Sequence, residues 1–456
     1  MVVPTPSRRT LRVTLALVVS ACFLAGALTA AGHDPVTLGG GLIEGPADGT
    51  TVVSVQGFHF QGEDNKKKPA RLVAADPTGS VEWMYESRPE TKWFYDVDPL
   101  ADGTLLVTAT NESGTTVFEF DPETDTRVWA EFLPIRDTHD VDLLENGNLV
   151  VANMREYADG VSDDRVFVYN RTTEQITWEW TFREHFSNDT DGGFGEDWTH
   201  VNDVDPVGDD AFLVSPRNFD QVLLIDRETK EITARLGDDG DHETLFEQHN
   251  PDVVATDPLT ILVADSENDR VVEYARIDGE WQRTWAVTGF HWPRDADRLP
   301  NGNTLVTDTL AHRVVEVTPA GEVVWEFAAP WAPYDAERLG TGDGSNGPTM
   351  RAHGTTGTVE VNGTTTDGPA GTTTPADVIG ATGDGTPLAE FTSWLARVWA
   401  HVTPWLRPVW LSRWAFAAFA LGGTVACCWG AGELLVRRRA VLGRIGTAFE
   451  RVRERL

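Results

Sequence analysis

Histidine recurs at one position of a repeated pattern in this 456-residue chain. Each copy stands shortly before an aspartate-rich anchor, Asp-x-Asp or similar, and an apolar run follows the anchor. The four copies are His139 in THDVD, His200 in THVNDVD, His249 in EQHNPDV and His291 in FHWPRDAD, and Tyr95 takes the equivalent place in another copy. Neutral imidazole is both a nucleophile and an acid-base group near pH 7. Histidines gathered from several repeats could therefore carry group transfer.

A second position of the repeat lies at the end of the next strand and holds one strong cation. Met154, Arg217, Ser266 and Thr309 occupy it in four successive copies. The guanidinium of arginine is a planar fork that suits the oxygens of an anion such as sulfate. Arg217 is thus a candidate anion ligand beside the histidines.

A structural role is the alternative for each histidine. Duplication of a repeat would also copy a histidine whose only task is to hydrogen-bond the anchor aspartate or a nearby carbonyl. That alternative does not account for Arg217. Four further histidines fall outside the repeat position and are predicted to lie on the surface: His59, His185, His242 and His312.

The repeat itself predicts the elements that position these side chains. Successive anchors are 44, 63, 49 and 43 residues apart and begin at Asp96, Asp140, Asp203, Asp252 and Asp295. After each anchor come Asn-Gly or Asp-Gly turns, alternating strands and a final strand that carries tryptophan, a pattern typical of hairpins. Four short strands in a unit of this length indicate a propeller blade.

The fold is therefore predicted to be all-β, a six-bladed β-propeller over residues 40–339, with seven blades as the weaker count. Residues 48–85 supply a sixth, less regular unit, and Asp335-Ala336-Glu337-Arg338 resembles the strand that closes the ring. A solenoid is the competing architecture, but it would need capping repeats. Innermost strands line the axis, so the repeated histidines should meet at one rim. The inserts 155–164 and 184–198 would form a lid there.

Charge is distributed unevenly along the chain. The net charge is −34, but residues 32–390 carry 68 acidic and 24 basic side chains, whereas the two ends carry 3 and 13. Such a protein does not bind nucleic acid through bulk charge. Only five lysines accompany 32 arginines, a composition that indicates a halophilic source. Cys22, Cys427 and Cys428 all lie in apolar end segments, so the acidic region contains no disulfide.

The two ends predict membrane attachment. Residues 1–31 read as a signal peptide or an N-terminal membrane anchor, with cleavage left open, because an uncharged run follows Arg12. Residues 414–436 form a predicted transmembrane helix, and 437–456 a basic cytoplasmic tail. The positive-inside rule then puts the propeller on the extracellular face of the cell membrane.

Two further segments join the propeller to this helix. Residues 340–388 are rich in Gly, Thr and Asp and predict a flexible stalk. Residues 389–413 carry several tryptophans and predict an interfacial segment at the headgroup level. Four sequons suggest a glycoprotein: Asn111, Asn170, Asn188 and Asn362.

Three motifs within the predicted ring carry a resemblance to a known family. They are His-x-Asn-Asp at 200, Ser-x-Arg at 217 and Gln-His at 249. In this arrangement the region from about 50 to 330 resembles the arylsulfotransferase family, whose members move a sulfuryl group between phenols without the nucleotide donor PAPS. The stalk and the second span have no counterpart in it.

The resemblance implies a ping-pong transfer from an aryl sulfate to a phenol through a sulfohistidine, without a cofactor. His249 would be the nucleophile, Arg217 and His200 would bind the sulfuryl oxygens, and His139 would complete the anion site or act as acid or base. Residues expected to contact substrate are His291, Asn202, Trp198, Phe219 and Trp292.

Two other classes of function stay open. Units such as VADSENDRVVEY also resemble NHL repeats, and some propellers of that type are zinc-dependent lyases. Zinc would need three imidazoles within about 2.1 Å of one point, and a nearby arginine would oppose it. Asp238, Asp239 and Asp241 could hold structural Ca²⁺ without matching a full loop pattern. The other class is a non-enzymatic, membrane-tethered propeller that binds a partner or a glycan. The sequence leaves the oligomeric state open.

Overall fold

The computed structural model describes residues 7–33, 36–57, 68–86, 88, 91–365, 368–369, 373–408 and 410–453. The chain divides into two compact units. One is Val36–Thr372, and the other combines Met1–Pro35 with Thr373–Leu456. Each unit is described by itself.

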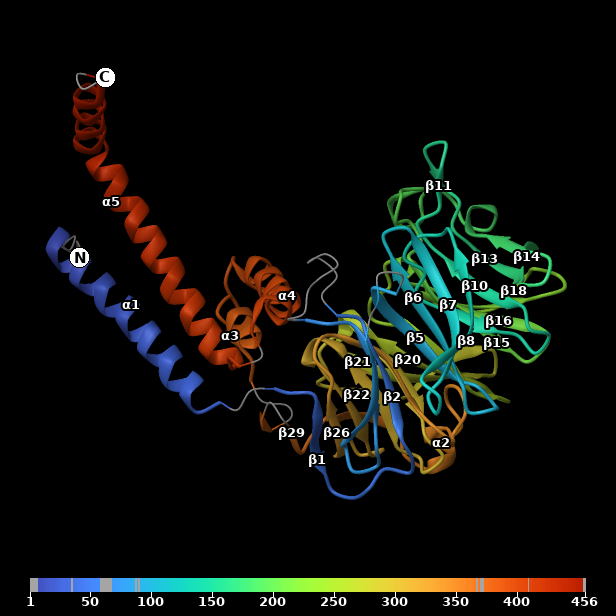
Figure 1. Ribbon diagram of the computed structural model, residues 1–456. Coiled ribbons are helices and arrows are strands. Elements are labelled where there is room, and N and C mark those ends of the chain that lie inside the picture. The colour runs from blue at the N-terminus through green and yellow to red at the C-terminus, as the bar shows by residue number, and fades with distance from the viewer. Residues whose placement is uncertain are drawn as a thin grey trace. The chain divides into compact units, whose positions relative to one another are not determined.

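The unit Val36–Thr372 is a six-bladed β-propeller, as predicted, and each blade has four antiparallel strands in a sheet of its own (Figure 1). Blades A to F are given from the innermost strand outward. Blade A is β27 (Pro333–Arg338), β2 (Thr51–Val55), β3 (Arg71–Ala75) and β4 (Val81–Glu86). Blade B is β5 (Trp93–Pro99), β6 (Leu105–Asn111), β7 (Gly114–Asp121) and β8 (Thr126–Leu133). Blade C is β9 (Val141–Leu143), β10 (Leu149–Asn153), β13 (Arg165–Asn170) and β14 (Gln175–Thr181).

The remaining blades follow the same order. Blade D is β15 (Val201–Val207), β16 (Ala211–Pro216), β17 (Gln221–Asp226) and β18 (Ile232–Gly237). Blade E is β19 (His249–Thr256), β20 (Leu259–Asp265), β21 (Arg270–Ile277) and β22 (Glu280–Thr288). Blade F is β23 (Pro293–Arg298), β24 (Thr304–Asp308), β25 (Arg313–Val317) and β26 (Val323–Ala328).

The ring closes by pairing the two ends of the propeller sequence. The last strand, β27, pairs antiparallel with β2, in the register Thr51 with Arg338 and Val53 with Ala336. The motif that begins at Asp335 therefore supplies the innermost strand of the irregular first unit. Closure of this kind joins the first and last blades and leaves only short, protected sheet edges.

Anchor aspartates staple the inner strands of neighbouring blades. The Oδ2 atom of Asp335 in blade A accepts a hydrogen bond from the backbone N–H of Val97 in blade B, at 2.9 Å. Asp295 in blade F bonds Ala336 in blade A in the same way, at 3.2 Å. Asp140 in blade C repeats this bond to blade D. The repeated aspartate is therefore explained by blade contact, because it satisfies a buried N–H of the next inner strand.

Tryptophans of the outermost strands make a second set of staples. The indole of Trp180 in blade C donates to the carbonyl of Lys230 in blade D, at 3.1 Å. The indole of Trp285 in blade E donates to the carbonyl of Pro319 in blade F, at 3.1 Å. Both tryptophans are buried. The recurring final tryptophan of the sequence repeat thus fills the space between blades and bonds the next blade's outer turn.

Elements beyond the four-stranded pattern extend two blades and decorate one. The added strands are β1 (Gly39–Ile43), antiparallel to β26, and β28 (Gly357–Glu360), parallel to β22. The two predicted inserts contain β11 (Tyr157–Ala158), β12 (Val161–Ser162) and the 3₁₀ turns η2 (Phe182–Glu184) and η3 (Thr190–Gly192). Similar turns follow the second strands of blades D to F as η4 (Arg217–Phe219), η5 (Ser266–Asn268) and η6 (Thr309–Ala311).

Part of the predicted stalk packs on the propeller instead of forming a flexible linker. Within it lie α2 (Met350–His353), β28, β29 (Thr364–Thr365) and β30 (Gly368–Pro369). Met350 and Val361 are buried in the cluster beneath blades E and F. The Gly- and Thr-rich composition predicts a linker here. The buried side chains of Met350 and Val361 and the pairing of β28 with β22 instead hold this segment on the propeller.

The second unit is helical. It contains α1 (Arg8–Ala31), α3 (Pro375–Ala381), α4 (Ala389–Leu406) and α5 (Arg413–Arg453). Among the described residues, the helices long and apolar enough to cross a membrane are α1 and the first part of α5, Arg413–Val436. They match the two predicted apolar segments. The predicted Trp-rich interfacial segment is largely α4, which contains Pro404 in its last turn and ends before α5 begins.

Candidate active site

The candidate site is built from the residues just before the inner carboxylates. Five of the six inner strands show a register irregularity at this place: β5, β15, β19, β23 and β27. A β-bulge redirects the side chain of its extra residue. Tyr95, Arg294 and Tyr334 lie at such irregularities, and His139 lies two residues before β9 begins. All four side chains are buried.

Three of the four predicted histidines meet in one aromatic cluster. The ring of His139 stacks on Tyr95 with centroids 4.1 Å apart and lies 5.3 Å from the ring of His200. Tyr334 is the link to the third histidine, since its ring lies 5.2 Å from His139 and 6.1 Å from His249. The predicted meeting of repeat histidines on one rim is therefore observed for His139, His200 and His249.

His249 is held in the tautomer that a nucleophile needs. Its Nδ1 lies 2.8 Å from the hydroxyl oxygen of Ser266. That hydroxyl also lies 2.6 Å from the carbonyl of Pro293, which can only accept. The single hydroxyl proton of Ser266 goes to Pro293, so His249 must donate from Nδ1. The lone pair is then on Nε2, which is buried and has no hydrogen-bond partner among the described residues.

The environment keeps His249 neutral. Burial lowers its pKa well below 6.5, and the positive charges of Arg294 and Arg217 lower it further. A neutral imidazole with a free Nε2 lone pair is the reactive form for attack on an electrophile.

His200 bridges a carboxylate and the predicted anion ligand. Its Nδ1 lies 2.9 Å from Oδ1 of Asp197, and its Nε2 lies 3.5 Å from a guanidinium nitrogen of Arg217. Burial lowers the pKa of His200 to about 4, the charge of Arg217 lowers it as well, and Asp197 opposes the change. Neutral His200 therefore donates to Asp197 and presents an acceptor at Nε2. Arg217 also pairs with Glu247 at 3.0 Å.

The two inserts position His200. Asp197 ends the second insert and also binds Arg155 of the first, with nitrogen to oxygen distances of 2.8 and 3.2 Å. Arg155 further binds Asp137, which accepts a hydrogen bond from the Tyr95 hydroxyl at 2.6 Å. Burial opposes ionisation of Asp197, but hydrogen bonds from His200 and Arg155 hold its pKa below the usual value. The two inserts that were expected to form a lid therefore hold His200 in place.

Arg294 is a second cation of the site that the sequence argument missed. Its guanidinium lies 4.3 Å from the ring of Trp292 and 4.5 Å from that of Tyr334, and it donates to Gln56 at 2.9 Å. It has no carboxylate partner among the described ion pairs. Burial lowers its pKa to about 10, so it remains charged at neutral pH. Arg217 is therefore not the only cation beside the histidine cluster.

Two of the predicted substrate contacts, Trp292 and Asn202, lie at or beside the cluster. The ring of Trp292 is 5.6 Å from His249. Asn202 is buried on β15, donates to the carbonyl of Gln248 at 2.9 Å and has an unpaired amide oxygen. His291 is half-buried, and its backbone N–H bonds Asp308, so its contacts place it beside blade F's second strand.

Trp198 and Phe219 do not line the site. Both are buried in the apolar cluster between blades C and D, with their rings 5.0 Å apart. Both side chains pack into this cluster, so the predicted substrate contact is corrected to a packing role. His312 is likewise buried, not at the surface, and its Nδ1 accepts from the N–H of Ala332. His59 lies outside the described residues.

The arrangement does not fit zinc. The guanidinium of Arg217 faces Nε2 of His200, and its positive charge opposes a metal ion at that nitrogen. Within the described part of the chain, the group of side chains spaced for a metal is Asp98, Asp142 and Asp343, with no histidine and none of the Asp238–Asp241 loop.

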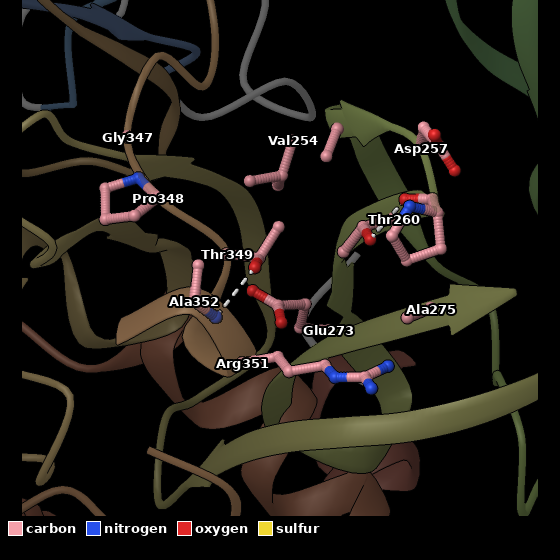
Figure 2. Close-up of a pocket in the computed structure, with 12 residues that line it drawn as sticks. Val254, Asp257, Thr260, Glu273, Ala275, Gly347, Pro348, Thr349, Arg351 and Ala352 are labelled. Atoms are coloured by element: carbon pink, nitrogen blue, oxygen red, sulfur yellow. Dashed lines mark hydrogen bonds between the residues drawn. The ribbon is translucent and has the colours of Figure 1, made fainter. Parts of the chain in front are cut away.

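A separate cleft of about 520 Å³ lies beside blade E and α2 (Figure 2). Its one buried acid, Glu273, is occupied, because it accepts from the N–H of Met350 and pairs with Arg298 at 3.3 Å. The lining also includes the charged side chains of Asp257 and Arg351, and the rest is apolar or small and polar, such as Val254 and Thr260. This cleft lacks the convergent histidines of the cluster.

Residues 47–254 match the family model described as Arylsulfotransferase (ASST). The match ends within blade E and includes His139, His200, Arg217 and His249. It supports an aryl sulfotransferase-like, transferase assignment. A comparison with curated proteins found no match.

Solved structures match this chain at low identity and with TM-scores below 0.5. A protein of unknown function from Bacteroides caccae is 12% identical, with a TM-score of 0.44, and the alignment covers 63% of this chain and 98% of that one. Virginiamycin B lyase from Staphylococcus aureus is 11% identical, with a TM-score of 0.38 and coverages of 59% and 85%. Periplasmic gluconolactonase from Pseudomonas aeruginosa is 13% identical, with a TM-score of 0.42 and coverages of 63% and 98%.

Proposed function

We propose that this protein transfers a sulfuryl group from an aryl sulfate to a phenol through a sulfohistidine at His249. The observation that carries the proposal is the unpartnered Nε2 of His249, whose lone pair is fixed by the Ser266 and Pro293 hydrogen bonds. The family match over residues 47–254 supports the same class of reaction.

In the first half-reaction, Nε2 of His249 attacks the sulfur of the aryl sulfate. The N–S bond forms while the bond from sulfur to the aryl oxygen breaks, and the phenolate leaves with that electron pair. The imidazole gains positive character, which the Nδ1–H bond to Ser266 stabilises. Arg217 and Arg294 supply the positive charge that attracts the sulfuryl oxygens and the departing phenolate.

In the second half-reaction, a phenol attacks the same sulfur and the N–S bond breaks, which returns the electron pair to Nε2. The phenol must lose its proton as it attacks. His200 is the group suited to take this proton, because its Nε2 is an acceptor and Asp197 stabilises the resulting imidazolium. This assigns His200 a base role in place of direct sulfuryl binding. His139, bonded to the Tyr334 hydroxyl at 2.8 Å, completes the aromatic wall.

The same proposal places the propeller outside the cell, on the membrane. The start of α1 carries Arg8, Arg9 and Arg12, and the apolar part of α5 is followed by Arg437–Arg439. Both basic flanks therefore belong on the cytoplasmic side of the membrane. The acidic, lysine-poor middle of the chain suits a high-salt medium, and the assays below are therefore set in high salt.

The test uses the full-length protein in detergent and high salt, with an aryl sulfate donor and a phenol acceptor. Wild type should release the donor's phenol, form the sulfated acceptor and, with donor alone, gain the mass of one SO₃ group on the peptide containing His249. His249→Ala should show none of these three results. Transfer that survives His249→Ala would overturn the sulfohistidine mechanism. Stoichiometric zinc without transfer would favour a lyase, and the absence of both would favour a binding propeller.

A further inference from the structure

The axis of the propeller is lined by carboxylates beyond the histidine cluster. The inner strands all begin at the histidine cluster and run away from it along the axis. Tyr95 is therefore followed by Asp96 and Asp98, and His139 by Asp140 and Asp142. Alternate residues of a strand face the same side. The first carboxylates of these strands therefore form one layer, which includes the staples Asp140, Asp295 and Asp335. The second carboxylates form an outer layer, about 10 Å beyond the histidines along the axis.

The outer layer lacks compensating charge. Asp98 and Asp142 are each more than nine-tenths buried, with exposed fractions of 7% and 5%, and the Oδ2 atom of each has no hydrogen-bond partner. Buried oxygens of Asp297 and Glu337 in the same layer are also unpaired. No arginine or lysine among the described ion pairs reaches these four side chains. Buried carboxylates without a partner are costly unless they coordinate a metal or take up protons.

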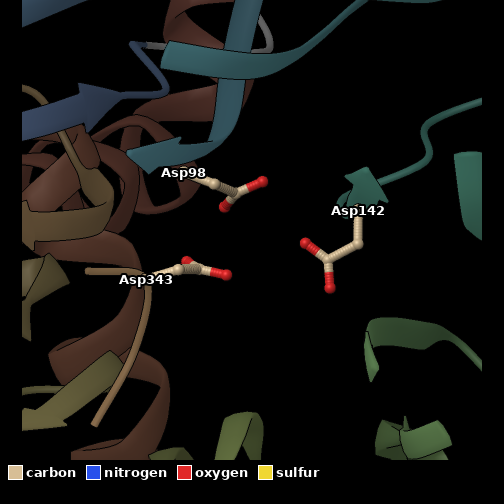
Figure 3. Close-up of side chains that lie close together, drawn as sticks. All are labelled: Asp98, Asp142 and Asp343. Carbon is tan, nitrogen blue, oxygen red and sulfur yellow. The ribbon is translucent and has the colours of Figure 1, made fainter. Parts of the chain in front are cut away.

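A loop adds one more carboxylate to this layer. Asp343 lies with Asp98 and Asp142 so that one oxygen of each falls within 4.8 Å of the others, and Figure 3 shows the three side chains turned toward a common space. The loop is fixed beside Asp343 by hydrogen bonds from Gly344 to Glu337 and from Ser345 to Asp252. A third charge held against two buried ones opposes folding unless a cation lies between them.

We propose that Asp98, Asp142 and Asp343 bind a divalent cation of the Ca²⁺ type on the propeller axis. Ca²⁺ takes oxygen ligands at about 2.3–2.6 Å, so oxygens up to about 5 Å apart can share one ion. Mg²⁺ requires shorter bonds and a stricter octahedron, which suits this spread less well. The ion ties the inner strands of blades B and C to the loop after β27, and it makes no contact with the histidine cluster.

Calcium binding to full-length protein tests this site directly. After chelation and dialysis in high salt, wild type should bind one Ca²⁺ per chain by calorimetry and elemental analysis, and Ca²⁺ should raise its unfolding temperature. Asp343→Asn, which alters an exposed loop, should weaken binding at least tenfold, and Asp142→Asn should abolish it. Asp239→Asn is the matched control in the exposed acidic loop and should bind as wild type does.

Two results would overturn the site. One is wild type without stoichiometric Ca²⁺, which would mean that the carboxyl groups share protons. The other is loss of binding in Asp239→Asn with normal binding in Asp343→Asn, which would move the ion to the surface loop.

A different observation carries a second inference, about the N-terminal helix. Helices α1 and α5 pack antiparallel within their unit (Figure 1). Arg12 forms two hydrogen bonds with Glu433, at 2.5 and 2.7 Å. Phe419 covers Gly26, where a Cβ would come within 2.9 Å of its ring, and a Cβ at Gly422 would come within 3.0 Å of Cys22. Glycines opposite bulky side chains allow close approach of membrane helices.

We infer that α1 stays attached and spans the membrane beside α5, instead of being removed as a signal peptide. A cleaved α1 would remove Arg12, the cation that forms two hydrogen bonds with Glu433 in an apolar helix. The purified membrane protein should therefore retain peptides from residues 8–31. A mature chain that begins after residue 31 would overturn the inference.

Cross-linking tests the packing itself. In a background of Cys427→Ser and Cys428→Ser, an oxidant should link Cys22 to the new thiol in Gly422→Cys. Protease fragments containing α1 and α5 should then stay joined until reduction. Gly423→Cys is the matched control, since a Cβ at Gly423 meets nothing within 4 Å. Equal linking in both variants, or none in Gly422→Cys, would overturn the packing.

Discussion

The hydroxyl of Ser266 lies 2.8 Å from Nδ1 of His249 and donates its own hydrogen bond to the carbonyl of Pro293. The hydroxyl therefore determines which nitrogen of the histidine carries a proton. Ser266 begins η5, at the repeat position that Arg217 occupies in blade D. One repeated position thus places a guanidinium beside His200 in one blade and a hydroxyl beside His249 in the next.

Ser266→Ala should slow formation of the sulfohistidine about 10- to 100-fold, because Nδ1–H loses its acceptor and the Nε2 lone pair is no longer fixed. The measurement is the burst of phenol released from an aryl sulfate in a single turnover. Thr309→Val is the matched control at the same position of blade F, where the hydroxyl has no partner, and should leave the burst unchanged. Equal bursts in wild type and Ser266→Ala would contradict the tautomer argument.

Arg294→Gln should lower kcat/KM for aryl sulfates about 100- to 1,000-fold, the loss typical of removing one preorganised charge from a transition state. The guanidinium faces Trp292 and Tyr334 and has no described carboxylate partner, so its charge is directed to the substrate. Steady-state kinetics with a chromogenic donor measures the change. Arg276→Gln, on an exposed outer strand, is the control. A decrease below threefold would exclude Arg294 from the anion site.

The fold could be predicted because each blade repeats the same pattern of residues. Anchor aspartates, turn dipeptides and final tryptophans each have a contact that explains them, and together they predict six blades and a closing strand at Asp335. The rim histidines followed from the same periodicity. Asp197 and Arg155 were not predictable as His200 supports, because their contacts join two irregular inserts.

Arg294 shows what periodicity alone missed. In FHWPRDAD the repeat histidine is His291, but the residue directly before the anchor aspartate is Arg294. Tyr95, His139 and Tyr334 hold this same position in their blades. Aligning the repeats on the aspartate would have identified it. The acidic composition was similarly interpreted as surface hydration, although many anchor carboxylates are buried along the axis. Composition does not distinguish a buried carboxylate from an exposed one.

Transfer should persist in mildly acidic solution. The pKa of His200 is lowered to about 4 and that of His249 lies well below 6.5, so both stay neutral as the pH falls through 6. At pH 5.5 a group with a pKa of about 4 is roughly 97% neutral, against roughly 10% for an ordinary histidine. The burst rate at pH 5.5 should therefore be at least half of that at pH 7.5. A midpoint near 6.5 would show that the histidines are solvated and ordinary.

Asp335→Ala should destabilise the propeller by about 1–3 kcal/mol more than Asp96→Ala. Both are buried first-layer aspartates on adjacent inner strands, so the two changes remove the same atoms from similar surroundings. Asp335 accepts from the N–H of Val97, which is left unpaired and buried when the carboxylate is removed. Oδ2 of Asp96 has no partner, and its removal relieves repulsion from neighbouring carboxylates. Denaturant unfolding of both variants at one salt concentration measures the difference. Equal losses of stability would show that the Asp335 hydrogen bond does not hold the ring closed.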